Sequence, residues 1–180
     1  MPVTALVAYA VFFALAFGLR AVLHYRRTGT TGYVGLSGRA FSTEWWAGVL
    51  FGVAVVTGGL APVAQLLGLV RPFAGAGVAV SYGAGLAFTA VGIAGTLWSQ
   101  LAMGNSWRVG VDHTARTELV SRGPFRFVRN PIFTWMTFAS AGLMLLAPNV
   151  LAVASFVTLL IALEIQVRAV EEPYLLRTHG

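Results

Sequence analysis

The sequence predicts an all-α fold: a polytopic membrane helix bundle with about five transmembrane helices, the last two forming a helical hairpin. Three observations predict it. Of the 180 residues, 57% are hydrophobic and only 10% are charged, which is far from the balance of soluble domains. Apolar runs long enough to cross a hydrocarbon core of about 30 Å recur along the chain. The charged residues gather between these runs, where loops at the membrane surface are expected.

Three apolar segments account for the first part of the chain. The first runs from Val3 to Leu19 and is followed, not preceded, by basic residues, which favours a retained span over a cleaved signal peptide. The second runs from about Trp45 to Val70 and the third from Ala74 to Met103. The third segment carries small residues at four-residue spacing, namely Gly77, Ser81, Gly85 and Thr89. Such a stripe lets helix backbones approach closely in lipid, so we expect helix packing here rather than a ligand groove.

The last apolar block is interrupted by Pro148-Asn149. This dipeptide predicts a turn, with one arm descending from about Ile132 and the other returning from Val150 to about Val167. The first arm is short for a straight crossing. The sequence therefore allows either five full spans or four spans with a partly inserted hairpin. In both cases the two ends of the hairpin lie on the same side.

All twelve basic residues are arginines, and the formal net charge is +6. Every arginine except Arg71 falls between the first and second spans, between the third span and the hairpin, or after the hairpin. By the positive-inside rule we expect the N-terminus outside, and the arginine-rich loop and C-terminal tail cytoplasmic. The chain is thus expected in the cell (inner or plasma) membrane, in contact with membrane lipids. Anionic headgroups explain the basic excess, and no soluble basic module indicates nucleic-acid binding.

The organisation expected along the chain has two parts within one structural domain. Residues 1–103 supply three N-terminal spans, and residues 104–180 supply a cytoplasmic loop, the hairpin and the tail. The loop over residues 28–44 is rich in Gly and Thr and lacks the context of a phosphate loop. It is therefore expected to be a flexible connection.

Several chemistries find no support in the residues. The chain contains no cysteine, which excludes disulfides and thiol nucleophiles. The three histidines do not stand at the spacing of metal ligands, and no metal site is predicted. Ser121, Thr134 and Ser155 have no neighbouring histidine base in sequence, so a Ser-His hydrolase is unsupported.

Two polar stretches have features that a basic loop at the membrane surface does not explain. In "LVSRGPFRFVRNPIFTW", Pro124 and Pro131 fix the backbone while Gly123 relaxes it, so the segment is shaped as well as charged. The pair Glu171-Glu172 follows the hairpin, near a helix C-terminus where the macrodipole disfavours carboxylates. A cation should compensate for it: Arg129, Arg168, or the ammonium or sulfonium of a ligand.

Glu164 lies deeper in the apolar sequence of the last arm. An ionisable group within a membrane helix is a functional-site hypothesis by default. Arg168 stands four residues later, so a structural ion pair is an equal alternative to a ligand contact.

Taken in order, "LVSRGPFRFVRNPIF", one hairpin and "EEPYLL" resemble the membrane methyltransferases related to isoprenylcysteine carboxyl methyltransferase and to the phospholipid N-methyltransferases. Their signature is approximately G-P-Y-R-x-x-R-H-P-x-Y-x-G, a membrane hairpin and E-E. The similarity covers about the C-terminal half, from "MGNSWRVG" onward, whereas the N-terminal spans match only as spans.

This resemblance implies an S-adenosyl-L-methionine-dependent methyltransferase whose cofactor lies at the cytoplasmic membrane face, between residues 118–133 and the acidic pair. The cofactor-binding residues that it implies are Gly104, Glu118, Leu119, Val120, Gly123, Pro124, Phe125, Arg129, Asn130, Pro131, Phe133, Glu171 and Glu172. For catalysis it implies Arg129, Asn130 and Glu172. The implied acceptor is a lipophilic small molecule that enters from the bilayer: the carboxylate of a prenylated or isoprenoid substrate, or a lipid headgroup.

The chemistry of methyl transfer is consistent with such a site. The reaction is an in-line displacement on a sulfonium, so alignment and exclusion of water supply most of the catalysis. An acceptor carboxylate could be oriented by Arg129 through paired N–H bonds. An acceptor amine could instead lose its proton to Glu171 or Glu172.

Three positions depart from the signature. Asn130 stands in place of histidine, which excludes histidine acid–base chemistry there because an amide does not titrate near neutral pH. Phe133 stands in place of tyrosine and lacks its hydroxyl. Trp135 stands in place of glycine and is expected to fill space that glycine would leave open to a substrate chain.

Two other functions stay open on the sequence. One is a membrane reductase of the sterol-reductase type, which uses NADPH and has a similar C-terminal membrane architecture. The other is a non-catalytic membrane scaffold that keeps the fold, which the substitutions at positions 130 and 135 motivate.

Overall fold

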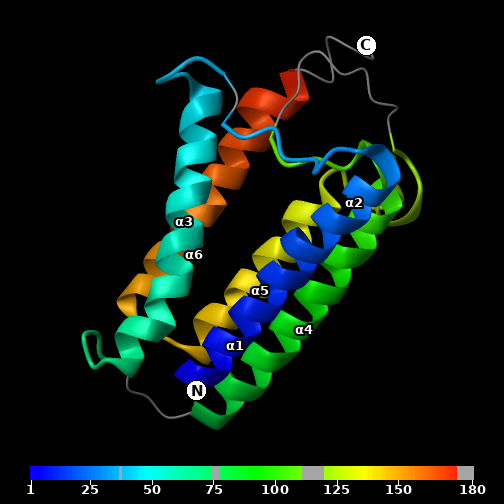
Figure 1. The fold of residues 1–180 in the computed structure, drawn as a ribbon. Coiled ribbons are helices and arrows are strands. Elements are labelled where there is room, and N and C mark those ends of the chain that lie inside the picture. Colours follow the sequence, from blue (N-terminus) through cyan, green and yellow to red (C-terminus); the bar gives the residue numbers. More distant parts are fainter. Residues whose placement is uncertain (37, 74–77, 111–119, 174–180) are drawn as a thin grey trace.

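A computed structural model describes residues 1–36, 38–73, 78–110 and 120–173. All regular elements among these residues are helical (Figure 1). Four helices are long and apolar enough to cross a membrane: Pro2–Thr28, Thr43–Leu66, Ser81–Ser106 and Val150–Glu171. A fifth apolar helix, Pro131–Leu146, is shorter. The predicted fold class is therefore confirmed, and the chain is a multi-pass membrane protein.

The elements follow the predicted order. They are α1 (Pro2–Phe13), η1 (Ala14–Leu19), α2 (Arg20–Thr28), α3 (Thr43–Leu66), α4 (Val78–Met103), η2 (Gly104–Ser106), η3 (Gly123–Arg126), α5 (Pro131–Leu146), α6 (Val150–Ile165) and η4 (Gln166–Glu171). The segments η1 and η4 are π-helical turns, and η2 and η3 are 3₁₀ turns.

The first helix is longer than the sequence predicts. It continues beyond Leu19 through η1 and α2 and ends at Gly29, whose φ of 77° gives a left-handed cap. Arg20 and His24 are consequently helical and buried. A charged residue is tolerated there because Arg20 Nη2 donates a hydrogen bond to the carbonyl oxygen of Gly104, a contact that local sequence does not reveal.

Small residues join α4 closely to α5. A side chain on Gly92 would collide with the backbone of Ala139, and one on Gly95 would collide with the Trp135 ring. Gly85 of the predicted stripe likewise faces Leu146 of α5. The packing interpretation of the stripe is thus confirmed for Gly85 and for Thr89, which lies against Gly142 of α5. Gly77 lies outside the described residues.

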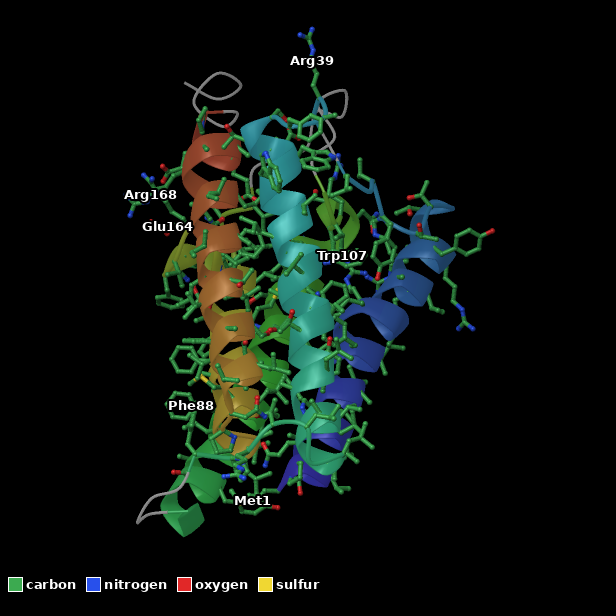
Figure 2. All side chains as sticks on the ribbon, turned by 90° about the vertical axis from the view of Figure 1, so that its left-hand side faces the viewer. Met1, Arg39, Phe88, Trp107, Glu164 and Arg168 are labelled. Carbon is green, nitrogen blue, oxygen red and sulfur yellow. The ribbon has the colours of Figure 1, made fainter. Side chains whose placement is uncertain are left out.

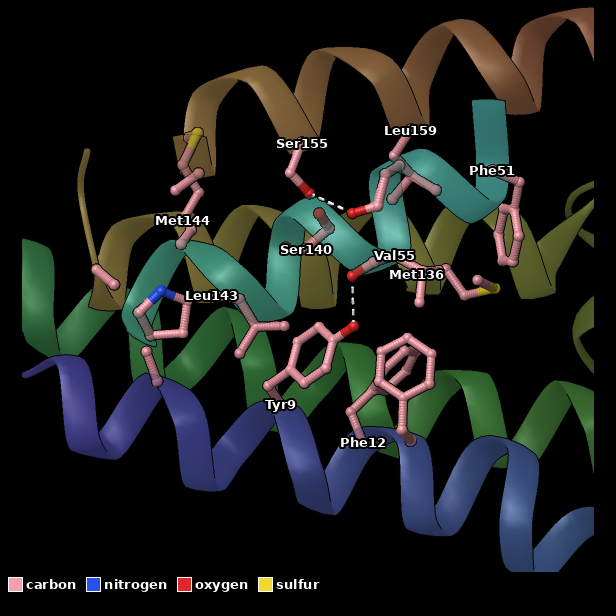
Figure 3. Close-up of a pocket in the computed structure, with 18 residues that line it drawn as sticks. Tyr9, Phe12, Phe51, Val55, Met136, Ser140, Leu143, Met144, Ser155 and Leu159 are labelled. Atoms are coloured by element: carbon pink, nitrogen blue, oxygen red, sulfur yellow. Dashed lines mark hydrogen bonds between the residues drawn. The ribbon is translucent and has the colours of Figure 1, made fainter. Parts of the chain in front are cut away.

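Helices α3 and α6 form the other close pair, and α1 bridges it to α5 (Figure 1). Ser155 Oγ of α6 donates to Ala54 O of α3 at 2.8 Å, and Tyr9 Oη of α1 donates to Val55 O at 2.6 Å (Figure 3). Gly58 and Gly59 leave room for the Tyr9 ring. A small cavity of about 50 Å³ remains between these helices.

The hairpin turns where Pro148-Asn149 predicts it. The buried Asn149 caps α6, since its Oδ1 accepts from Ala152 N at 3.0 Å. Its Nδ2 donates to Ala61 O at 3.1 Å and to Gln65 Oε1 at 2.9 Å. One asparagine therefore starts the last helix and holds the turn against the end of α3.

The polar segments gather at one end of the bundle. The end of α2, the start of α3, the segment after α4, the start of α5 and the end of α6 all lie there, opposite the N-terminus (Figure 1). The arginine-rich loop and the acidic pair are therefore brought to the same end, as the span count predicts.

Candidate functional site

A pocket of about 420 Å³ opens at this polar end. Its size lies within the range of about 300–1,000 Å³ that is typical of small-molecule sites. The lining comes from both halves of the chain. Its polar and aromatic members are Phe17, Tyr33, Glu44, Phe51, Gln100, Trp107, Arg108, Phe125, Asn130, Phe133, Gln166 and Glu171.

One wall is the segment that ends in α5. Gly123 has a φ of 60°, a left-handed conformation that favours glycine. The buried Pro124 follows, and its carbonyl accepts from Phe127 N at 3.1 Å to close the η3 turn. Asn130 and the buried Pro131 then start α5. The predicted shaping of this segment is confirmed, and it places Phe125 and Asn130 in the pocket.

The acidic wall comes from the π-helical turn η4. Glu171 lines the pocket beside Asn130. With the Asn130 amide nitrogen facing the carboxylate, Nδ2 donates to Glu171 Oε2 at 3.3 Å. The amide is a hydrogen-bond donor without charge, so it orients the Glu171 carboxyl group in the pocket without adding a cation.

Glu172 occupies a different environment from Glu171. Its Oε1 lies 3.3 Å from Nη1 of Arg129, and the two side chains are 41% and 89% exposed. Neither residue lines the pocket. Arg129 is thus the compensating cation for Glu172, one of the partners that the sequence predicts.

Glu164 and Arg168 form the other predicted ion pair. Figure 2 shows the two residues together on the outer side of α6, and both side chains are more than half exposed. The ion-pair alternative is correct, and Glu164 lies outside the pocket.

The third wall comes from the loop after α2. A β-bridge joins Tyr33 to Val109, with hydrogen bonds of 2.9 Å from Val34 N to Val109 O and 2.8 Å from Val109 N to Gly32 O. The prediction of a flexible connection is therefore wrong for this part of the loop, because pairing with a distant segment orders it. Burial raises the pKa of the Tyr33 phenol, so its hydroxyl stays a hydrogen-bond donor at neutral pH.

Trp107 is held in place by the first helix. The Arg20 guanidinium lies 4.8 Å from the centre of the Trp107 ring, within the range of a cation–π contact. His24 contacts the same ring edge-on, with 5.6 Å between ring centroids. These contacts fix the indole at the margin of the pocket. They also assign Gly104 a supporting role, since its carbonyl oxygen anchors Arg20.

The lining fits an S-adenosyl compound in size and chemistry. Six aromatic rings line the pocket, from Phe17, Tyr33, Phe51, Trp107, Phe125 and Phe133. Aromatic faces suit both a planar base and a sulfonium cation. Glu171 offers a carboxylate for an ammonium or hydroxyl group. Gln100 also lines the pocket, and in the described part of the chain its buried oxygen Oε1 has no hydrogen-bond partner.

The predicted site residues separate into three groups. Phe125, Asn130, Phe133 and Glu171 line the pocket. A second group is described but does not line it: Gly104, Val120, Gly123, Pro124, Arg129, Pro131 and Glu172. Glu118 and Leu119 lie outside the described residues.

Sequence reasoning missed the residues that come from the N-terminal half, including Phe17, Tyr33, Glu44 and Gln100. No motif marks them, because their role depends on long-range packing. The expectation for Trp135 is also corrected. Its ring packs against Gly95 of α4 and does not line the pocket. The missing side chain of Gly95 leaves the room that the indole occupies.

Comparison with known families matches the C-terminal part of the chain. The family described as phospholipid methyltransferase matches residues 80–180, which is more than half of the chain. Searches among curated proteins and among solved structures gave no match.

Proposed function

Because the chain belongs to the phospholipid methyltransferase family, a family of membrane methyltransferases, we propose that it transfers a methyl group from S-adenosyl-L-methionine to a lipophilic acceptor. That family generally uses this cofactor. One observation of the chain itself carries the proposal. Asn130 and Glu171, which the family signature singles out in separate segments, meet at a single pocket of about 420 Å³.

The residues of the pocket have distinct parts in this proposal. The aromatic rings hold the adenosyl group and the sulfonium region. Glu171 receives the amino group or the ribose hydroxyls, and Asn130 holds the Glu171 carboxylate in place. When bound, the cofactor supplies an activated methyl group on sulfur. The apolar lining from α3 and α6, including Phe51 and Leu163, excludes water and aligns the acceptor.

The acceptor has two possible chemistries in this proposal. A lipid amine requires a proton acceptor, which Glu171 provides within the pocket. A carboxylate of an isoprenoid or prenylated substrate requires a cation instead, and Arg108 lines the pocket. In either case the acceptor enters from the bilayer, and the site faces the cytoplasm because the arginine-rich segments surround it. The C-terminal part, residues 104–180, completes the cofactor site together with the N-terminal spans.

Calorimetry of the purified chain in detergent with S-adenosylhomocysteine tests the cofactor assignment. We expect binding, and a loss of about tenfold or more in affinity for Phe125→Ala, since a stacked ring contributes about 0.5–1.5 kcal/mol beyond its buried area. Phe88→Ala is the matched control, because Phe88 stacks on Phe138 and does not line the pocket.

A folded wild-type sample that does not bind S-adenosylhomocysteine would exclude the proposal. Thermal stabilisation by NADPH in place of S-adenosylhomocysteine would instead indicate a reductase, since a ligand that binds only the folded state raises the melting temperature.

A further inference from the structure

The further inference concerns Gln100, a residue of α4 that lines the pocket and belongs to no part of the family signature. Its side chain is only 2% exposed. One end of the amide is occupied, because Nε2 donates to Ala16 O of the first helix at 2.9 Å. The other end is not: Oε1 is buried without a hydrogen-bond partner in the described part of the chain.

The hydrogen bond with Ala16 explains why the amide nitrogen of Gln100, and not its oxygen, faces the first helix. Ala16 lies in the π-helical turn η1, where Arg20 N–H bonds to Leu15 O instead of to Ala16 O, its partner in a regular α-helix. Gln100 Nε2 bonds to that carbonyl. With the nitrogen so engaged, the amide oxygen is left without a partner in a residue that lines the pocket. A buried acceptor without a partner is rare in folded proteins.

We propose that Gln100 is a cofactor-binding residue whose Oε1 accepts a hydrogen bond from a neutral N–H or O–H group of the S-adenosyl cofactor. This inference rests on the proposed function of the pocket. The two kinds of donor to distinguish are the adenine amine and the ribose hydroxyls.

Two variants separate ligand binding from helix packing. Gln100→Met removes both the donor and the acceptor, whereas Gln100→Glu loses the donor to Ala16 but keeps an acceptor oxygen. Calorimetry with S-adenosylhomocysteine should give an affinity about tenfold weaker for Gln100→Met, the effect of one lost hydrogen bond, and an affinity within about threefold of wild type for Gln100→Glu. Equal weakening of both variants would assign Gln100 to helix packing and overturn the inference.

A measurement on the wild-type chain covers the case in which a variant does not fold. The chain has glutamine only at positions 65, 100 and 166, so selective ¹⁵N-glutamine labelling gives three side-chain amides to assign. Saturation with S-adenosylhomocysteine should shift the Gln100 amide resonances. Gln65 is the control, since it bonds to Asn149 far from the pocket. Unchanged Gln100 resonances in a sample that binds the ligand would overturn the inference, while absence of binding would contradict the proposed function instead.

S-inosylhomocysteine, which lacks the adenine amine, distinguishes the two donors. If the amine donates to Gln100, this compound binds wild type more weakly than S-adenosylhomocysteine, but the two bind Gln100→Met equally. If a ribose hydroxyl donates, Gln100→Met weakens both compounds alike.

Discussion

At the scale of single residues, the two adjacent glutamates at the end of the last helix have different roles. Successive residues of a helix project about 100° apart, so Glu171 reaches the pocket while Glu172 pairs with Arg129 outside it. The family signature treats the pair as a unit. Only the direction in which each side chain leaves the helix separates a ligand-facing carboxylate from a surface ion pair.

This difference predicts opposite outcomes for matched substitutions. Glu171→Gln should weaken S-adenosylhomocysteine binding about tenfold or more, because it replaces a carboxyl oxygen in the pocket with an amide nitrogen that cannot accept a hydrogen bond. Glu172→Gln should change the affinity by less than about threefold, since an exposed ion pair contributes about 0–1 kcal/mol. Calorimetry measures both, with thermal unfolding as the check on folding. A larger effect at Glu172 would restore it as the catalytic carboxylate that the signature implies.

At the scale of elements, the close contact of α4 with α5 is the feature that positions the site. Gly92 packs on the backbone of Ala139, and Gly142 packs on Thr89. Side chains cannot be inserted there without separating the helices. Since Gln100 lies in the last turn of α4 and Asn130 directly precedes α5, the spacing between α4 and α5 also sets the width of the pocket.

Two glycines of the same helix provide a matched test of this packing. Gly92→Ala forces its new methyl group into Ala139, and overpacking of this kind costs about 1–3 kcal/mol. Gly83→Ala meets no atom within 4 Å and should be neutral or slightly stabilising. Thermal unfolding in detergent compares them. Equal melting temperatures for the two variants would argue against the tight α4–α5 interface.

At the scale of the whole molecule, the distribution of arginine predicts how the bundle sits in the membrane. The pocket and the arginine-rich segments lie at one end, whereas the α3–α4 connection with Arg71 lies at the other (Figure 1). The positive-inside rule then places the pocket at the cytoplasmic face.

Absence of cysteine from the natural chain allows a direct test of this orientation. Arg39→Cys places a thiol at the end of the bundle that holds the pocket (Figure 2). Leu69→Cys places one at the opposite end, where Leu69 is 74% exposed. A membrane-impermeant maleimide applied to intact cells should label Leu69→Cys at once and Arg39→Cys only after permeabilisation. The reverse pattern would place the N-terminus in the cytoplasm and the pocket outside.

The sequence by itself determined the class of fold, the order of the helices and the turn of the hairpin. These features follow from local properties: the length of apolar runs, proline and asparagine at a turn, and the position of charge. The same local reasoning located the shaped segment around Pro124 and Pro131, because proline restricts the backbone dihedral angles and glycine widens them wherever they occur. The family signature then pointed to Asn130 and Glu171, which do share a pocket.

Only the tertiary structure decided which residues complete that pocket. Gln100 donates a hydrogen bond to Ala16, Arg20 donates one to Gly104, and Tyr33 forms a β-bridge with Val109. Each of these pairs joins segments far apart in the chain. Such contacts depend on how two helices lie against each other, which periodicity and composition do not specify. The physical reason is that side-chain direction and helix spacing are set by packing of the whole bundle, so the N-terminal wall of the site carries no local signal.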